Sequence, residues 1–140
     1  QRVSLVDLFF EWSDGDRWVV RAEGLKILTK EYYSFPGIDY TEYGWYIEAS
    51  YRLTDQWQLA VCYNDYFAEY DDTGKYIHRE FIIGINYWPD MNTVLKASYH
   101  NIFGFGYAFP SAEQHQQLID NSQSIDQTNH AVFAGMQFSF

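Results

Sequence analysis

The sequence predicts an all-β fold, a transmembrane antiparallel up-and-down β-barrel to which this chain contributes about seven strands. Three observations predict it. Apolar and polar residues alternate along nearly the whole chain, which is the period of a strand whose two faces meet different surroundings. The alternating runs are about 10–13 residues long, close to the ~9–11 that a tilted strand needs to cross a bilayer, whereas soluble strands average ~5–6. Short and long connections follow one another, as in membrane barrels.

Composition excludes several other classes. The chain has 140 residues, 21% of them aromatic, and a formal net charge of −10. This aromatic content excludes a disordered chain, and the negative charge argues against a nucleic-acid partner because phosphate is repelled. No apolar run approaches the ~18 residues of a membrane-spanning helix. A single cysteine, Cys62, excludes an internal disulfide and a cysteine metal cluster.

The first two strands are expected over residues 3–12 and 17–29. In the first, apolar residues alternate with a set that includes two acids. In the second, the alternation slips after Gly24, so that Leu25 and Ile27 change face, and a β-bulge near Gly24 would explain the slip.

The remaining strands are expected over residues 42–53, 56–69, 77–88, 93–103 and 130–140. The third alternates most clearly, with one face apolar and the other polar: Trp45, Ile47, Ala49, Tyr51 and Leu53 against Tyr46, Glu48, Ser50 and Arg52. The fourth, fifth and sixth repeat the pattern, beginning their apolar faces at Trp57, Phe81 and Leu95. The last carries an apolar stripe that includes Val132, Ala134, Met136, Phe138 and Phe140.

Turn chemistry separates the strands. Short turns are expected at residues 13–16, 54–55 and 89–92, where Asp-Gly and Pro-Asp pairs favour tight reversals. Longer links are expected at about 30–41, 70–76 and 104–129. A link of the last length is unusual inside a compact soluble domain, which again favours the barrel.

The chemistry of the two faces of the expected sheet predicts what each face contacts. Aromatic residues of the apolar face cluster at strand ends, as in the interfacial girdles of membrane barrels. Beside the short turns these are Trp12, Trp18, Trp57, Tyr87, Trp88 and Phe140, and nearer the long links Tyr43, Trp45, Tyr66, Phe67, Tyr99, Phe103 and Phe105. The other face carries ionised groups that need water, because burying them in a dry core would be costly. We therefore expect a wet lumen whose candidate lining is Arg21, Glu23, Glu48, Arg52, Glu80, Lys96 and His100. The alternatives are a lipocalin-like barrel and a periplasmic sandwich, which pack apolar side chains inward.

The C-terminal stripe resembles the last strand of Gram-negative outer-membrane proteins, in which a terminal aromatic residue is read by the barrel-assembly machinery. The resemblance implies that Phe138 and Phe140 are the assembly signal. Two hairpin sequences, at residues 44–58 and 83–96, are similar to those of the phosphate-selective porin O/P-like group and related porins. That resemblance implies a 16-stranded barrel, a homotrimer and solute passage. The Lys and Arg cluster of its anion-selecting members is absent, so phosphate selectivity does not carry over.

Topology extends this expectation. With the C-terminus periplasmic, seven up-and-down strands would leave the first and last strands parallel, whereas single-chain barrels close antiparallel with an even number. We therefore expect residues 1–140 to be the C-terminal portion of one larger barrel domain. Its other strands would come from a missing segment or another chain.

The expected function is passive diffusion of small hydrophilic solutes across the Gram-negative outer membrane, without bond chemistry, cofactor or metal. The expected partners are outer-membrane lipid, lipopolysaccharide and the assembly machinery. The alternative is a non-conducting barrel that acts as a structural, receptor or assembly and secretion subunit. Transported solute, charge selectivity and oligomeric state are not fixed by the sequence.

Other chemistry receives weaker support. None of the four histidines, His78, His100, His115 and His130, has metal-site spacing. Ser98 and His100 share the polar face as in a hydrolase, but the sequence places no acid to orient the histidine and contains no Gly-x-Ser-x-Gly. An acidic group, Asp39, Glu42, Glu69, Asp71 and Asp72, is either a solvated loop or a divalent-cation site bridging to lipopolysaccharide.

Overall fold

Seven long strands form one sheet in the computed structural model, which describes residues 2–30, 40–70, 74–104 and 128–138. The strands are β1 (Arg2–Ser13), β2 (Trp18–Lys30), β3 (Tyr40–Arg52), β4 (Trp57–Tyr70), β5 (Gly74–Asp90), β6 (Thr93–Gly104) and β7 (Thr128–Phe138). The described residues contain no helix. The prediction of an all-β fold with seven strands is confirmed, and the strand ends lie within a few residues of the expected positions.

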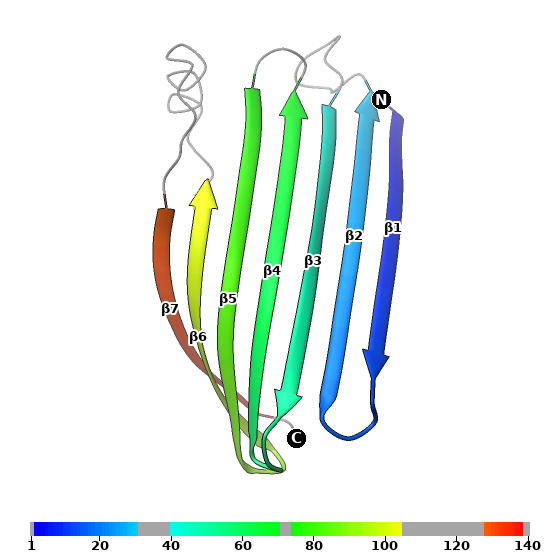
Figure 1. Cartoon of the computed structure of the whole chain (residues 1–140). Helices are drawn as coiled ribbons and strands as arrows, with labels where there is room; N and C mark the ends of the chain where they lie inside the picture. The colour runs from blue at the N-terminus through cyan, green and yellow to red at the C-terminus, as the bar shows by residue number, and fades with distance from the viewer. Residues whose placement is uncertain (1, 31–39, 71–73, 105–127, 139–140) are drawn as a thin grey trace.

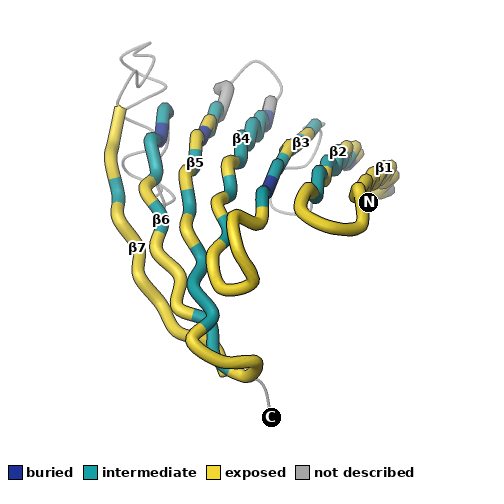
Figure 2. Tube along the Cα trace, turned by 60° about the horizontal axis from the view of Figure 1, so that its bottom comes forward, coloured by how far each residue is buried: buried dark blue, intermediate teal, exposed yellow. Residues whose placement is uncertain are grey.

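The topology is the simplest one available to seven strands. Each strand pairs antiparallel with its neighbour in sequence, so the spatial order is β1 to β7 without a crossover (Figure 1). The three short turns lie at one end of the sheet, and the strand ends that flank the longer connections lie at the other. The sheet is curved but open within the described residues (Figure 2), and its edge strands β1 and β7 run in the same direction.

Strict alternation along each strand gives the sheet two chemically different faces. Because the register is regular, residues opposite one another share a face, as Ala49, Val61 and Ile83 do on β3, β4 and β5. We call the face that carries these three residues the apolar face and the opposite one the polar face. The described strands depart from regular pairing between Tyr87 and Asp90, where β5 shifts against β6.

The expected bulge near Gly24 is wrong. β1 and β2 pair without interruption from Arg2 and Lys30 to Ser13 and Val19, and β2 pairs equally regularly with β3. Leu25 and Ile27 therefore stay on the polar face. The register simply places apolar residues there, and together with Val3, Leu5 and Phe9 of β1 they surround Asp7 in this corner of the polar face.

The short turns share one stabilising device, a side-chain oxygen that accepts backbone amides. In the turn between β1 and β2, Asp14 Oδ1 accepts from the amides of Asp16, Arg17 and Trp18 at 3.0, 2.9 and 2.9 Å, while Gly15 takes a positive φ of 89°. Thr54 Oγ1 accepts from the amides of Gln56 and Trp57 at 3.2 and 3.1 Å. Asp90 Oδ1 accepts from the amide of Asn92 at 2.8 Å.

The link between β4 and β5 is shorter than expected. Strand pairing continues to Tyr70 and Gly74, which leaves residues 71–73 as the connection where a link over residues 70–76 was expected. This hairpin therefore extends further from the turn end than its alternation pattern indicated.

Gly104 ends β6 in a conformation that only glycine tolerates well. Its φ is +94°, and a Cβ atom built there would overlap the carbonyl oxygen of Ile77 on β5. A glycine at this point lets the two backbones approach closely where the long link begins.

Asp14→Ala is expected to lower the free energy of unfolding, because three turn amides lose their acceptor. Those hydrogen bonds stabilise the carboxylate and lower the pKa of Asp14 below 3.8. The turn is therefore stabilised by the ionised carboxylate at every pH above its ordinary pKa. This stabilisation is lost as the pH falls through the lowered pKa of Asp14 in the folded protein. Chemical unfolding between pH 6 and pH 2, with Asp14→Asn as the variant that keeps an acceptor, tests this. Equal losses in both variants would contradict it.

Gly104→Ala is expected to cost more than the ~1–3 kcal/mol of a strained left-handed residue, because the new methyl group also meets backbone. The matched control is Gly135→Ala on β7, where a Cβ atom meets nothing within 4 Å. The control should change the free energy of unfolding by less than about 0.5 kcal/mol. Similar unfolding curves for the two variants would disprove the crowding at Gly104.

Candidate functional site

The candidate site is the polar face. The register places all seven predicted lining residues on this one face, across β2 to β6: Arg21, Glu23, Glu48, Arg52, Glu80, Lys96 and His100. They come from four strands, β2, β3, β5 and β6, and are up to 79 residues apart in the sequence. The unbroken pairing of β2 to β5 and the two-residue period bring them together.

The polar face is the less exposed of the two. Every residue of the described set that is buried belongs to it, including Ser50 at 5% and Glu80 at 6% exposure. By contrast Ile83 and Leu8, on the apolar face, are 47% and 72% exposed. Side chains on the concave side of a curved sheet crowd together, so this distribution identifies the polar face as the inner one. A protein that keeps its core dry distributes these residues the other way.

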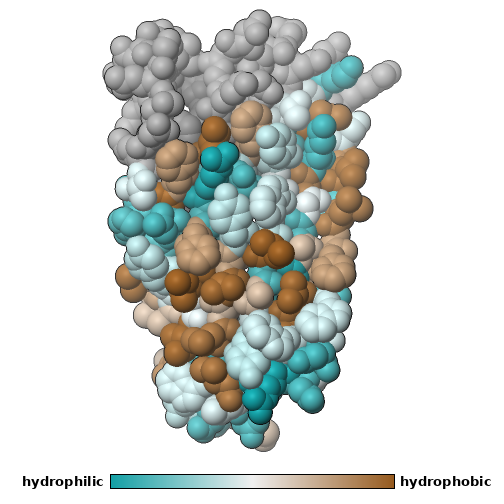
Figure 3. Space-filling view, in the orientation of Figure 1, coloured by the Kyte–Doolittle hydropathy of each residue, from teal (hydrophilic) through white to brown (hydrophobic). Residues whose placement is uncertain are grey.

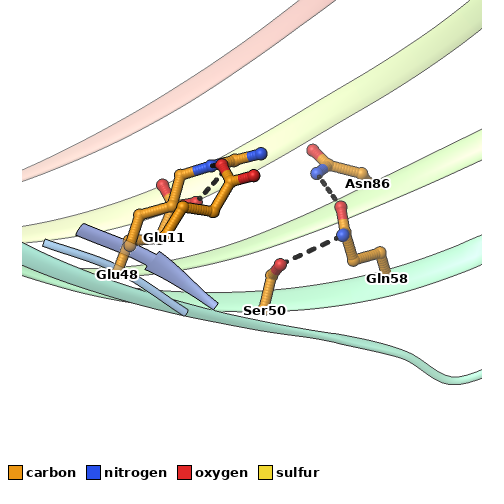
Figure 4. A network of polar contacts seen from close by, with 6 residues as sticks. Glu11, Glu48, Ser50, Gln58 and Asn86 are labelled. Carbon is orange, nitrogen blue, oxygen red and sulfur yellow. Dashed lines mark hydrogen bonds and ion pairs between the residues drawn. The ribbon is translucent and has the colours of Figure 1, made fainter. Parts of the chain in front are cut away.

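Charged side chains of the polar face are arranged in an alternating ladder across the strands. Arg21 donates from Nε to Glu11 Oε2 at 2.7 Å and from Nη1 to Glu48 Oε1 at 3.3 Å. The register pairs Arg21 of β2 with Glu11 of β1 and with Glu48 of β3. Figure 4 shows the two carboxylates close together. The three side chains are all at least one-third exposed, so each pair contributes little stability and mainly sets the local charge pattern.

An amide ladder runs parallel to the charged one, nearer the short turns. Gln58 donates to Ser50 Oγ at 3.2 Å, and Asn86 donates to Gln58 Oε1 at 2.9 Å, linking β3, β4 and β5 (Figure 4). The two cationic side chains nearest the short turns on this face, Arg52 and Lys96, also have partners. Arg52 lies 5.7 Å from the ring centroid of Trp88, and Lys96 donates to Gln137 Oε1 at 3.0 Å.

Carboxylates outnumber cations on the polar face. Among residues whose side chains the structure describes, the cations there are Arg21, Arg52 and Lys96. The carboxylates are Asp7, Glu11, Glu23, Glu42, Glu48 and Glu80. The inner face therefore carries a negative excess, as the whole chain does.

A second polar cluster joins β4, β5 and β6. His100 lies between Ser98 and Glu80, with Nε2 2.8 Å from Ser98 Oγ and Nδ1 2.6 Å from Glu80 Oε1. Asn64 donates to the other oxygen of Glu80 at 3.1 Å. The expectation that no acid orients this histidine is wrong. Glu80 is diagonal to His100 on the neighbouring strand, and this contact becomes visible only when the register of β5 and β6 is known.

The apolar face has an aliphatic middle between two levels of paired aromatic rings (Figure 3). Near the short turns, Trp18 with Tyr51 and Trp57 with Tyr87 have ring centroids 4.7 and 4.4 Å apart. Toward the long links, Trp45 with Tyr63 and Tyr43 with Phe67 lie 5.4 and 4.8 Å apart. The aliphatic residues between them are Val20, Ala22, Ile47, Ala49, Leu59, Val61, Ile83 and Ile85.

Two residues assigned to the aromatic girdles lie on the polar face instead. Trp88 is adjacent to Tyr87, so the two rings cannot share a face, and Trp88 meets Arg52. Tyr66 is two residues from Asn64 on β4 and therefore lies on the same polar face, where it donates a hydrogen bond to Glu42. Phe105 and Phe140 lie outside the described residues.

A charged pair lies within the apolar face, at the level of Trp45. Arg79 Nε lies 3.5 Å from Asp65 Oδ2 on the same face, one register row beyond Tyr63 and Phe81. On β4, the residues from Trp57 to Phe67 include both aromatic levels and span about 33 Å along the strand, or about 25 Å in height at a tilt of ~40°.

The other residues singled out from the sequence lie on both faces of the sheet. Phe138 pairs with Thr93 at the end of β7 and is exposed. Cys62 is half-buried on the polar face and donates its thiol to Asn64 Oδ1 at 3.2 Å. His130 Nδ1 lies 2.7 Å from the Tyr99 hydroxyl on the apolar face, and His78 Nε2 lies 3.8 Å from Glu80 Oε2.

The predicted acidic group lies mostly outside the described residues: Asp39, Asp71 and Asp72 are there, and the Glu69 side chain is not described. His115 also lies outside the described residues. In the part of the chain that the structure does describe, no group of three or more histidine, cysteine or acidic residues could hold a metal ion.

No family model, curated protein or solved structure matches this chain. Among the described residues, none forms a helix long and apolar enough to cross a membrane. The assignment of a function therefore depends on the geometry and chemistry of the two faces.

Proposed function

We propose that this chain forms part of the wall of a water-filled outer-membrane channel for small hydrophilic solutes. The observation that carries the proposal is the reversed burial of the two faces: charged and amide side chains on the crowded inner face, apolar side chains on the exposed outer one. A sheet in water loses stability by this arrangement. A sheet between hydrocarbon and an aqueous lumen gains from it on both sides.

The dimensions of the outer face support the membrane setting. The two aromatic levels of this face together span about 25 Å, on the order of the height of the outward apolar band of known membrane barrels. Tyrosine and tryptophan rings at both boundaries would place their polar atoms among lipid headgroups, including lipopolysaccharide on the outer side. The turns stabilised by Asp14, Thr54 and Asp90 would then lie on the periplasmic side.

A closed wall needs more strands than these seven. β1 and β7 are parallel and each lacks a partner on one side within the described residues, so antiparallel closure requires an odd number of further strands. These would come from another polypeptide or from chain outside this sequence, and a homotrimer of porin-like barrels is one arrangement consistent with this. Diffusion through such a lumen requires no covalent step.

The negative excess of the inner face favours cations. Fixed charges along a wet lumen set the field that entering ions meet. With six carboxylates facing three cations, we infer that the channel passes cations more readily than anions.

Ile83→Arg is expected to destabilise the folded protein in lipid vesicles by about 2–4 kcal/mol, the cost of a cation on the lipid face near the bilayer midplane. Met91→Arg, in the turn between β5 and β6 and 97% exposed, is the matched control and should be near neutral. Free energies of unfolding in urea measure both. Because Ile83 is already 47% exposed, a sheet that faced water there would tolerate arginine, and equal stabilities would disprove the membrane setting.

The assembled protein in planar bilayers is expected to give steady single-channel currents with potassium more permeable than chloride. Arg52→Gln combined with Lys96→Gln removes two inner cations, so the permeability ratio should move further toward cations. Glu48→Gln, the opposite change of charge, should move it toward anions.

Reversal potentials in a salt gradient measure these ratios. Unchanged selectivity in all variants would rule out a lining role for these residues. Absence of any steady current would favour the non-conducting barrel.

A further inference from the structure

Ser98, His100 and Glu80 form a continuous hydrogen-bonded array on the polar face. His100 Nε2 lies 2.8 Å from the Ser98 hydroxyl, and His100 Nδ1 lies 2.6 Å from a Glu80 carboxylate oxygen. A neutral imidazole satisfies both contacts in one way, by donating Nδ1–H to the carboxylate and accepting the serine proton at Nε2. This is the arrangement that a nucleophilic serine, its base and an orienting acid require.

The regular geometry of β5 and β6 is enough to bring Ser98, His100 and Glu80 together. Ser98 and His100 are two residues apart on β6, so their side chains point from the same face in succession. His100 pairs across the sheet with Ile82 and Glu80 with Ile102, so His100 and Glu80 are diagonal neighbours on that face. No loop is needed to bring the three groups together, and two paired strands hold them rigidly.

Further contacts fix the acid and the base. Glu80 is 6% exposed, and its second oxygen accepts from Asn64 Nδ2 at 3.1 Å with His78 Nε2 3.8 Å away. The His100 ring lies edge-on to Phe133 of β7, with centroids 4.8 Å apart. A carboxylate held in this way orients the imidazole and stabilises the imidazolium that forms when the serine is deprotonated.

The serine has room beside it. Its register partner on β5 is Gly84, and a Cβ atom there would come no closer to the Ser98 side chain than 3.8 Å. Ser98 itself is only half-buried, and its partner on the other side is Phe133. Lys96, two residues away on the same face, donates to Gln137 Oε1 at 3.0 Å, and its ammonium group would have to turn from Gln137 toward Ser98 to stabilise a developing oxyanion.

We propose that this array cleaves carboxylic esters that enter the lumen, with Ser98 as the nucleophile and His100 as the general base. The Ser98 oxygen attacks the ester carbonyl carbon as its proton passes to His100 Nε2. The tetrahedral intermediate expels the alcohol, which takes that proton, and leaves an acyl group on Ser98. Water then attacks the acyl-serine, gives a proton to His100 and releases the carboxylic acid, and the proton returns to the Ser98 oxygen.

The position of Phe133 indicates which class of ester fits the site. The ring is 46% exposed, lies opposite Ser98 in the register and contacts His100, so an acyl chain attached to the reacting carbonyl can lie against it. Esters with a short apolar acyl chain fit this site. Glu80 touches no substrate and acts as a positioning residue.

The decisive experiment treats the folded, assembled protein with a fluorophosphonate, which phosphonylates an activated serine with loss of fluoride. Peptide mass spectrometry is expected to place the adduct on Ser98. Ser98→Ala should abolish it, whereas Ser50→Ala, which removes a serine of the same face that is hydrogen-bonded to Gln58, should leave it unchanged. His100→Gln should slow labelling by about 100-fold or more, the usual contribution of a general base.

Glu80→Gln should lower the maximal labelling rate while the probe concentration at half-maximal rate stays constant, and Glu80→Asp should restore part of the rate. A purely structural Glu80 would not separate these two quantities. Release of p-nitrophenol from p-nitrophenyl butyrate should follow the same order across the variants. Wild-type protein that shows no Ser98 adduct, or one whose formation is independent of His100, would overturn the proposal. Conductance is measured separately, so either result stands without the other.

Discussion

The structure depends on one constraint, the unbroken antiparallel register that ties the face of each residue to its position in the strand. From β1 to β5 the described pairing contains no irregularity, so a residue's parity alone decides whether it meets the inner or the outer surroundings. A slip by one residue would turn Arg21 and Glu48 outward and Ile47 and Val20 inward. The polar ladders and the apolar outer surface are therefore two results of the same pairing.

This constraint explains why the strands and the face of most residues could be predicted from the sequence. It also explains why four residues were assigned to the wrong face. The number of strands and the common face of the lining residues follow from a period of two, and the short turns follow from their turn-forming residues. The errors occurred where parity was not applied strictly: Trp88 and Tyr66 were assigned by their aromatic character, and Leu25 and Ile27 were moved by a bulge that regular pairing does not need. Strict parity would have placed all four correctly.

The array around His100 could not be read in this way, because parity gives the face of a residue but not its neighbours. Glu80 and His100 are 20 residues apart, and their contact depends on how far β5 is displaced along β6. That displacement is set near the turn, where pairing shifts between Tyr87 and Asp90. A different shift there would place Glu80 opposite other residues. Turn irregularities of this kind carry little signal in a single sequence.

Burial and chemistry are connected on the inner face. A carboxylate as enclosed as Glu80 must be surrounded by donors, because an unsatisfied buried charge is very costly. Asn64 and His100 provide those donors. Once an imidazole is fixed by its Nδ1, its Nε2 points in a defined direction, and strand geometry places Ser98 there. The need to satisfy one buried acid on the inner face is thus enough to produce the alignment that nucleophilic catalysis requires.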